Sequence, residues 1–143
     1  MLTRIHHAAI ICSDYETSKR FYTECLRLRI VVENFRADRQ SYKLDLALPD
    51  GSQIEFFTFP GAPERLSYPE ARGLRHLAFA VDDIDQCCKA LKSFGVVVEP
   101  IRLDEYTNQR FVFFCDPDGL PLELVQTRAR FSASAWQGTQ CRA

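Results

Sequence analysis

Residues 5–14 read IHHAAIICSD, and residues 74–83 read LRHLAFAVDD. The two stretches match in register at three positions, which pair His7 with His76, Ala9 with Ala78 and Asp14 with Asp83. Further along, PDGSQIE at 49–55 recurs as PDGLPLE at 117–123 at nearly the same spacing. Because self-similarity at a fixed period marks a repeated structural unit, the sequence predicts two copies of one module.

The expected elements follow the same order in both copies. Runs of β-branched and aromatic residues predict strands, and apolar residues at helical spacing predict one helix after the first strand. The expected strands span 4–12, 29–33, 42–48 and 53–59, and then 74–81, 96–101, 110–115 and 120–125. The helices are marked by Tyr15, Ser18, Phe21, Tyr22, Cys25 and Leu26, and by Ile84, Cys87, Cys88, Leu91 and Phe94. Each copy is therefore predicted to be a βαβββ module, and the fold class to be α+β.

Short-range signals predict where elements begin and turn. Ser13 and Asp82 are expected to cap the two helices, because each precedes an acidic residue at the third helical position. The Asp-Gly pairs at 50–51 and 118–119 predict hairpins between the last two strands of each module, with positive φ at both turn residues.

The pattern predicts a single domain over residues 1–126. Module 1 is expected over 3–59 and module 2 over 74–126, joined by a linker at 60–73 that is rich in Pro and Gly. Residues 127–143 are weakly patterned and are interpreted as a C-terminal tail.

The composition fits a globular domain with a core of its own. Of the 143 residues, 46% are hydrophobic and 26% are charged, and the net charge is −1. Such a balance disfavours nucleic-acid binding, and the sequence has neither the apolar run of a membrane span nor the pattern of a signal peptide. The six cysteines form no CxxC pair, so we expect reduced thiols and a cytoplasmic location.

Each module has one His in its first expected strand and one Glu in its last: His7 and Glu55, then His76 and Glu123. On a strand these side chains share a face with apolar neighbours, where a charge is costly unless it is paired or bound to a cation. Two imidazoles and two carboxylates suit zinc, nickel, cobalt, manganese or iron(II). A strand His is often only a core or surface residue, and His6 is interpreted so. For the other four residues, recurrence at equivalent places favours one divalent metal site.

These residues belong to a set of motifs that resembles the vicinal oxygen chelate superfamily of glyoxalases, bleomycin resistance proteins and dioxygenases. The motifs are His7-x-Ala9, Phe21-Tyr22, Glu55, GLRHLAF at 73–79 and DPDGLPLEL at 116–124. Within that superfamily, the chain is most similar to small bacterial glyoxalase I-like lyases. The resemblance covers residues 3–126. It implies a curved mixed sheet around a metal cleft, with His7, Glu55, His76 and Glu123 as the metal ligands.

The resemblance also implies an activity. We expect a metal-dependent lyase or isomerase of the lactoylglutathione lyase type, acting on a small 2-oxo or hemithioacetal substrate. The metal would bind vicinal oxygens and stabilise an enediolate while a carboxylate moves a proton between adjacent carbons. Glu123 is the expected base and Glu55 its counterpart. Arg39, Lys43 and Arg110 are candidate anchors for a substrate carboxylate.

Three positions depart from the glyoxalase I pattern. That enzyme usually has an Arg four residues after its first metal His and an Asn soon after its first metal Glu, both serving glutathione, whereas this chain has Ile11 and Phe59. The Gly that usually ends the first helix is Arg27, which tolerates a left-handed turn less well. The substrate is therefore expected to be smaller than the glutathione adduct, or to carry another thiol.

Other functions are left open by the sequence. Residues 73–84 also resemble methylmalonyl-CoA epimerase, although the second ligand there is typically Gln where this chain has Glu55. Thiol transferases that modify fosfomycin use three ligands, and a non-catalytic module that binds small molecules is the alternative outside the enzymes. A homodimer is expected, because half-sheets leave edges to cover and family members usually pair. The sequence does not decide whether one chain or two supply the four ligands.

Overall fold

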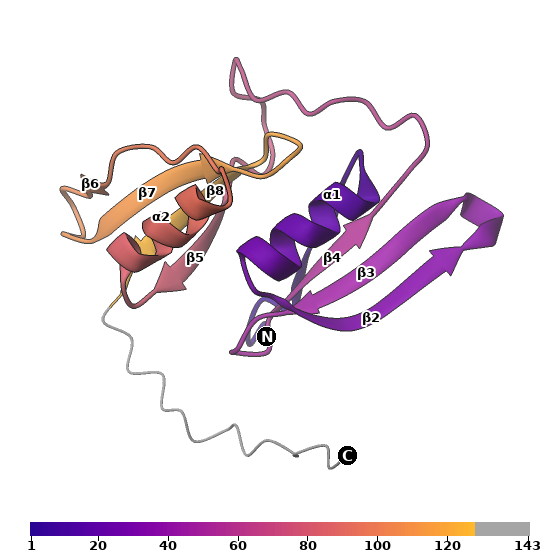
Figure 1. Ribbon diagram of the computed structural model, residues 1–143, viewed down its shortest axis with the longest axis horizontal. Helices are drawn as coiled ribbons and strands as arrows, with labels where there is room; N and C mark the ends of the chain where they lie inside the picture. Colours follow the sequence, from indigo (N-terminus) through magenta and orange to yellow (C-terminus); the bar gives the residue numbers. More distant parts are fainter. Residues whose placement is uncertain (128–143) are drawn as a thin grey trace, which may run out of the picture.

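The structure is a computed structural model that describes residues 1–127. In this part the chain forms two four-stranded mixed sheets, and one helix follows the first strand of each (Figure 1). The order β1-β4-β3-β2 of the first sheet repeats as β5-β8-β7-β6 in the second. The predicted α+β fold of two βαβββ modules is therefore confirmed.

The four strands and the α-helix of the two modules follow the same order, and module 1 has two further short helical segments. Module 1 contains β1 (His7–Ile11), α1 (Tyr15–Arg20) with its π-helical continuation η1 (Phe21–Cys25), β2 (Arg29–Arg36), the 3-10 turn η2 (Ala37–Arg39), β3 (Ser41–Ala47) and β4 (Gln53–Phe57). Module 2 contains β5 (Leu77–Val81), α2 (Ile84–Ser93), β6 (Arg102–Leu103), β7 (Arg110–Cys115) and β8 (Pro121–Gln126). The first and last strands of each module are parallel, and the other neighbours are antiparallel.

The strand expected at residues 96–101 is wrong, because the first strand after α2 begins at Arg102. Only Val98 of the stretch 96–101 joins the sheet, through an isolated bridge to Phe114, and β6 lies just beyond it. Pro100 has no amide hydrogen to donate to a ladder, and Val96, Val98 and Ile101 pack against the core instead, while Val97 is exposed. The segment therefore covers the core rather than extending the sheet.

Both helices begin one residue later than predicted. Asp14 and Asp83, rather than Ser13 and Asp82, are the N-caps, and each side chain accepts a hydrogen bond from a backbone amide of the first turn. The backbone amide of Ser13 donates instead to Oδ2 of Asp118 in module 2, at 3.0 Å.

The hairpins predicted at the two Asp-Gly pairs are confirmed, with a different turn geometry. Gly51 has a φ of 83° and Gly119 a φ of 76°, but neither preceding Asp has positive φ. The loops are longer than two residues, so only the Gly position needs the left-handed conformation. Arg27 has a φ of 59° without being a glycine.

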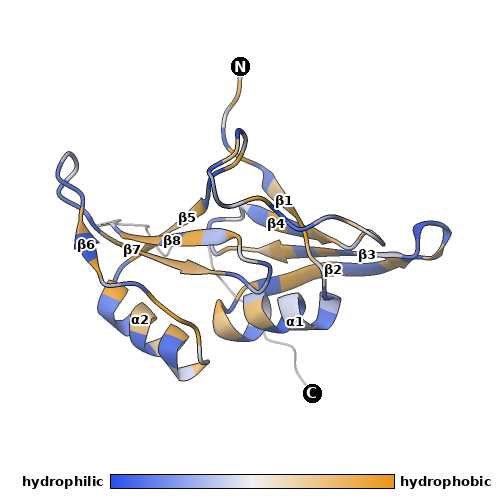
Figure 2. Ribbon diagram, turned by 90° about the horizontal axis from the view of Figure 1, so that it is seen from above, coloured by the Kyte–Doolittle hydropathy of each residue, from blue (hydrophilic) through white to orange (hydrophobic). Residues whose placement is uncertain are grey.

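The core lies between the two helices and one face of each sheet. Figure 2 shows α1 and α2 on the same side of the two sheets. The strand residues that point toward the helices are almost fully buried and form one cluster across both modules; they include Leu44, Leu46, Ile54, Phe56, Val112, Leu122 and Leu124. The opposite face of each sheet, which we call its open face, carries the alternate strand residues.

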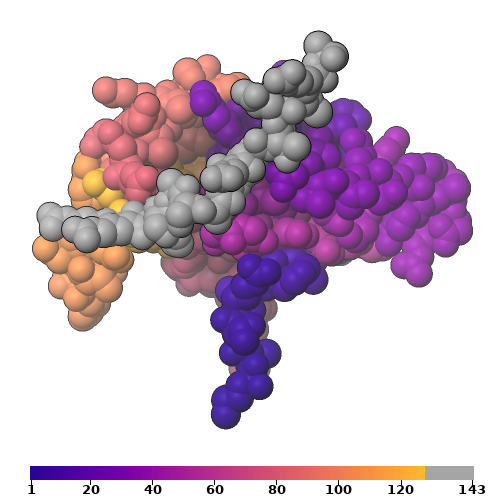
Figure 3. Space-filling model, turned by 90° about the horizontal axis from the view of Figure 1, so that it is seen from below, coloured from indigo at the N-terminus to yellow at the C-terminus, as the bar shows by residue number. Residues whose placement is uncertain are grey.

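A buried polar contact joins the two modules. The hydroxyl of Tyr22 in η1 donates to Oδ2 of Asp116 at 3.0 Å, and both residues are buried. Figure 3 shows the surface of the two modules, one coloured indigo to magenta and the other salmon to orange, with the first residues projecting from the body.

The cysteines of the described part agree with the expectation of reduced thiols. Five are free: Cys12, Cys25, Cys87, Cys88 and Cys115. Burial raises the pKa of Cys12 to about 11, so this thiol is a small apolar core residue at neutral pH. Cys141 and most of the predicted tail lie outside the described residues. In residues 1–127 no helix is long and apolar enough to cross a membrane.

Candidate metal centre

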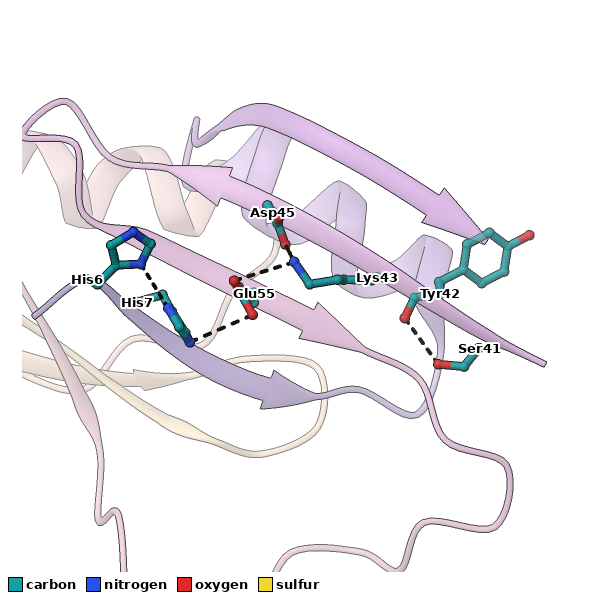
Figure 4. A network of polar contacts seen from close by, with 7 residues as sticks. All are labelled: His6, His7, Ser41, Tyr42, Lys43, Asp45 and Glu55. Carbon is teal, nitrogen blue, oxygen red and sulfur yellow. Dashed lines mark hydrogen bonds and ion pairs between the residues drawn. The ribbon is translucent and has the colours of Figure 1, made fainter. Parts of the chain in front are cut away.

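The first His–Glu pair lies on the open face of module 1. In the parallel ladder of β1 and β4, His7 lies opposite Gln53 and Ala9 opposite Glu55, so both site residues point to the same face. Nε2 of His7 is 3.8 Å from Oε2 of Glu55 (Figure 4). The Glu55 side chain is 16% exposed, against 41% for His7. An imidazole nitrogen and a largely buried carboxylate therefore face each other at the sheet surface.

A lysine occupies the other side of this carboxylate. Nζ of Lys43 donates to Oδ1 of Asp45 and lies 3.4 Å from Oε1 of Glu55 (Figure 4). The register of β3 and β4 places Asp45 directly opposite Glu55. Burial lowers the pKa of Lys43, but its contacts with Asp45 and Glu55 outweigh this and raise it overall. Lys43 thus stays charged and directs the two oxygens of Glu55 differently, with Oε1 toward the lysine and Oε2 toward His7.

A residue interpreted as inert in the sequence contacts the first pair. Nδ1 of His6 lies 3.0 Å from Nδ1 of His7, which is a hydrogen-bond distance (Figure 4). One ring must donate and the other accept. If His7 donates its Nδ1 proton, its Nε2 keeps a free lone pair toward Glu55, as a metal ligand requires. The His-His dipeptide was the signal that could have revealed this contact.

The second pair lies on the open face of module 2. His76 immediately precedes β5, and its Nε2 is 2.9 Å from Oε2 of Glu123 on β8. The ring stands edge-on to Phe113 at 5.1 Å between centroids. Its Nδ1 is buried and has no hydrogen-bond partner among the described residues. The two modules therefore repeat the same arrangement, with a His Nε2 directed at a Glu Oε2.

The four predicted ligands are brought together as two pairs rather than as one cluster. Within residues 1–127, no group of three or more His, Cys, Asp or Glu side chains is placed to hold a metal ion. Each pair offers one nitrogen and one oxygen, a donor set that suits zinc, nickel, cobalt or manganese. Nδ1 of His76 is buried without a partner among the described residues, so the contact of Nε2 with Glu123 is the polar contact of that ring there. The residues thus fit two halves of a divalent metal site.

The predicted substrate anchors lie in three different environments. Lys43 reaches the first pair, as described above. Arg110 turns toward α2, where its guanidinium donates to both carboxylate oxygens of Asp85 at 2.7 and 3.0 Å. Arg39 is in the exposed turn η2, where its Nε is 3.8 Å from Oδ2 of Asp38. Only Lys43 of the three contacts a predicted metal ligand.

A groove of about 1130 Å³ borders the second pair. Its walls are the linker and the open face of module 2, including His76, Phe111, Phe113 and Arg102. The Arg102 guanidinium stacks on both phenylalanines, with Cζ 4.9 and 5.6 Å from the ring centroids. Small-molecule binding needs such a concave surface with a few polar groups, and the groove offers it beside His76.

Two βαβββ modules that each present a His–Glu pair on the face opposite the helix define a protein with the glyoxalase-like fold. The chain belongs to the Glyoxalase/Bleomycin resistance protein/Dioxygenase superfamily, whose model matches residues 4–124.

Similar proteins extend over almost the whole of the described part. The uncharacterized protein YwkD of Bacillus subtilis (strain 168) is 53% identical over 126 residues, which cover 88% of this chain and 98% of YwkD. The probable lactoylglutathione lyase of Vibrio cholerae serotype O1 is 29% identical over 133 residues, covering 87% and 91% of the two chains. The crystal structure of SMU.1112c matches with a TM-score of 0.83 and 44% identity, covering 87% of this chain and 99% of that one. The lactoylglutathione lyase is thus a more distant relative than YwkD.

Proposed function

We propose that the protein is a metal-dependent lyase or isomerase of the glyoxalase I type, acting on a small 2-oxo or hemithioacetal substrate. The observation that carries the proposal is the repeated His–Glu pair, with Nε2 facing Oε2 in both modules. A protein that used its open faces only for packing would have no reason to keep a partly buried carboxylate beside an imidazole twice, because each such group is costly to desolvate.

We further propose that two copies of the chain complete the site. Each pair supplies two ligands, fewer than a stable divalent site with nitrogen and oxygen donors normally has. His7 and Glu55 of one copy would join His76 and Glu123 of a second, so that a symmetric dimer contains two equivalent sites. Dimerisation would also cover the exposed apolar side chains of β2, namely Ile30, Val31 and Val32.

Within this site the residues of the chain divide the work. His7 and His76 would hold the metal together with the two glutamates, and the metal would supply Lewis acidity toward the vicinal oxygens of the substrate. Glu123 takes the proton from one carbon and returns it to the next, with Glu55 as its counterpart on the other side. Lys43 keeps Oε1 of Glu55 occupied, so that Oε2 is the oxygen turned toward His7.

The free thiols of the described residues are consistent with a reducing compartment, and we propose a cytoplasmic location.

Hydrogen exchange with solvent tests the reaction directly. Wild-type protein loaded with each divalent metal is incubated in deuterated water with methylglyoxal hemithioacetals of several thiols. Deuterium should enter the substrate or product carbon, and Glu123→Gln should abolish the exchange while Glu105→Gln, at an exposed residue in module 2, leaves it intact. Tight binding without exchange or turnover for any thiol would instead support a non-catalytic binding module.

A further inference from the structure

A cation without an acidic partner lies on the open face of module 1. Arg36 ends β2, and its guanidinium lies over two aromatic rings, with Cζ 5.0 Å from the centroid of Phe57 and 5.7 Å from that of Phe59. Its Nη2 donates to Oγ of Ser41, a fully buried residue of β3. The buried hydroxyl and the two rings therefore fix the guanidinium in one position.

The charge of Arg36 is not neutralised within the described chain. No carboxylate of residues 1–127 lies within 4.0 Å of its nitrogens, whereas Arg102 and Arg110 pair with Glu99 and Asp85. Its Nε is buried and has no acceptor in this part of the chain. A partly buried cation without a counter-ion is costly, and an anion from outside the chain removes that cost.

Arg36 faces the same side of the sheet as the first His–Glu pair. Phe57, on which the guanidinium stacks, follows Glu55 by two residues along β4, so both point to the open face. A step of two residues along a strand is roughly 7 Å. On one side of Phe57 the surface is apolar, because Ile11, opposite it on β1, is 54% exposed. On the other side Lys43, opposite Phe57 on β3, places its ammonium 5.8 Å from the ring centroid.

We propose that Arg36 binds the anionic group of the substrate, a carboxylate or a phosphate, at the end remote from the metal. The substrate class is then a 2-oxo compound whose vicinal oxygens meet the metal and whose short apolar chain passes Ile11 and Phe57 to an anion held at Arg36. The metal end of this description rests on the proposed function, while the anion site depends only on Arg36, Ser41 and the two phenylalanines. Lys43 is not the anion anchor, because Asp45 and Glu55 already hold its ammonium.

Two 2-oxo acids of equal chain length test this specificity. The full-length protein is loaded with Co²⁺, and its visible spectrum is followed during titration with 2-oxoadipate, which ends in a carboxylate, or 2-oxohexanoate, which ends in a methyl group. Wild type should bind 2-oxoadipate about tenfold or more tightly, as expected for one charge-assisted contact. Arg36→Met, which keeps the stem over Phe57, should bring the two affinities within about twofold by removing only that contact.

Arg20→Met, on the exposed side of α1, is the control and should preserve the difference. Equal affinities in wild type, or a preference that survives Arg36→Met, would overturn the proposal.

A second readout requires no metal and therefore separates the anion site from the proposed reaction. In nitrogen-15 spectra of the metal-free full chain, the Nε–H signal of Arg36 is the one lost in Arg36→Met. Inorganic phosphate or acetate at constant ionic strength should shift that signal and leave the signal of Arg20 in place, and the anion that acts at the lower concentration identifies the class. If cobalt does not bind but this shift occurs, the anion site stands and the metal function fails. If neither anion shifts the signal, the anion site is refuted whatever the metal does.

Discussion

Nε2 of His76 lies 2.9 Å from Oε2 of Glu123, and the equivalent atoms of His7 and Glu55 lie 3.8 Å apart in the other module. The two pairs are related by the internal repeat, yet in the described chain they do not form one cluster. The arrangement implies that neither pair binds a metal tightly by itself. The proposed metal site requires that both pairs meet, and the proposed dimer is the arrangement by which we expect them to do so.

Mixed dimers distinguish this assembly from a site within one chain. His7→Ala and His76→Ala should each remove the metal, as measured by elemental analysis, because each breaks both sites of a symmetric dimer. In a heterodimer of the two variants, purified through two different tags, one site has lost both histidines and the other is intact. We expect about one metal ion per heterodimer and about two per wild-type dimer. Metal-free heterodimers would show that each chain builds its own site, and wild type that is monomeric in light scattering would exclude the shared one.

A second prediction concerns the lysine that contacts Glu55. Lys43→Met leaves the buried carboxylate of Asp45 without its ammonium partner, so the metal-free protein should lose about 1–3 kcal/mol of unfolding free energy. A bound divalent ion neutralises the neighbouring Glu55 and takes over part of that role. The stabilisation gained on adding metal should therefore be larger in Lys43→Met than in wild type, as measured by thermal unfolding with and without the ion.

Lys19→Met is the matched control for this variant. Lys19 forms an ion pair with Glu33 at 2.7 Å on the helix side of module 1. Such a partly exposed pair contributes at most about 1 kcal/mol, and its loss should leave the stabilisation by metal as in wild type. An equal gain on metal addition in all three proteins would contradict a competition between Lys43 and the metal for Glu55.

The pairing of elements could be predicted from the sequence because it rests on local signals that recur. The repeat, the alternation along each strand and the Asp-Gly turns agree with one another, so the fold and the four polar positions follow from them. The sequence does not show which partner each charged side chain meets in three dimensions. Both Arg110 and Lys43 are basic residues in strands. Arg110 donates to Asp85 on the helix side of its sheet, whereas Lys43 contacts Asp45 and Glu55 on the open face. Arg36 could not be recognised from the sequence as a candidate anion site, because its lack of a carboxylate partner in the described chain is visible only in the structure.

The contact between the modules predicts a pH dependence of stability. Burial raises the pKa of Asp116, and it outweighs the hydrogen bonds from Leu120, Tyr22 and Asp118 that lower it. A carboxyl group with a higher pKa in the folded than in the unfolded chain contributes stability below its unfolded pKa and loses it as the pH rises through the folded pKa. Asp116→Asn should therefore flatten the decrease in unfolding free energy as the pH rises above about 4, the unfolded value of an Asp, measured by urea unfolding.

Asp85→Asn should change the same curve in the opposite direction. The hydrogen bond from Arg110 lowers the pKa of this exposed carboxyl group. Its stabilising contribution is present above the unfolded pKa and is lost as the pH falls through the folded one. The variant should therefore lose stability near neutral pH and match wild type in acid. If both variants only shifted the unfolding free energy by a constant, with the pH slope of wild type, the raised pKa of Asp116 would be refuted.

The end of the first helix carries strain that one substitution should relieve. Arg27 has a φ of 59°, a left-handed conformation that costs a residue with a Cβ roughly 1–2 kcal/mol. Glycine adopts it freely but has more entropy to lose, so Arg27→Gly should raise the unfolding free energy by about 0.5–1 kcal/mol in urea unfolding. Asn108 has a similar φ of 57°, and because Asn tolerates this region, Asn108→Gly should change stability much less. Equal effects at the two positions would show that the left-handed conformation is not the cause.

The last prediction is weak turnover of the methylglyoxal–glutathione adduct. Ile11 is 54% exposed and Phe59 40% exposed, so the two positions expected to serve glutathione present apolar surface beside the proposed site. Apolar side chains cannot offset the desolvation of a charged tripeptide, and we expect kcat/KM for this adduct below the usual enzyme range of about 10⁴–10⁸ M⁻¹s⁻¹.

Restoring the polar groups tests whether these two positions are the cause. Ile11→Arg combined with Phe59→Asn should raise kcat/KM for the glutathione adduct by about tenfold or more, since each new contact to a charged substrate is worth roughly 1.5–3 kcal/mol. Ile5→Arg adds the same charge at an exposed residue before β1 and should have little effect. The gain should appear with glutathione and not with uncharged thiols of similar reactivity. Efficient turnover of the glutathione adduct by wild type would show that Ile11 and Phe59 do not exclude it, and that the open face of module 1 binds the tripeptide in another way.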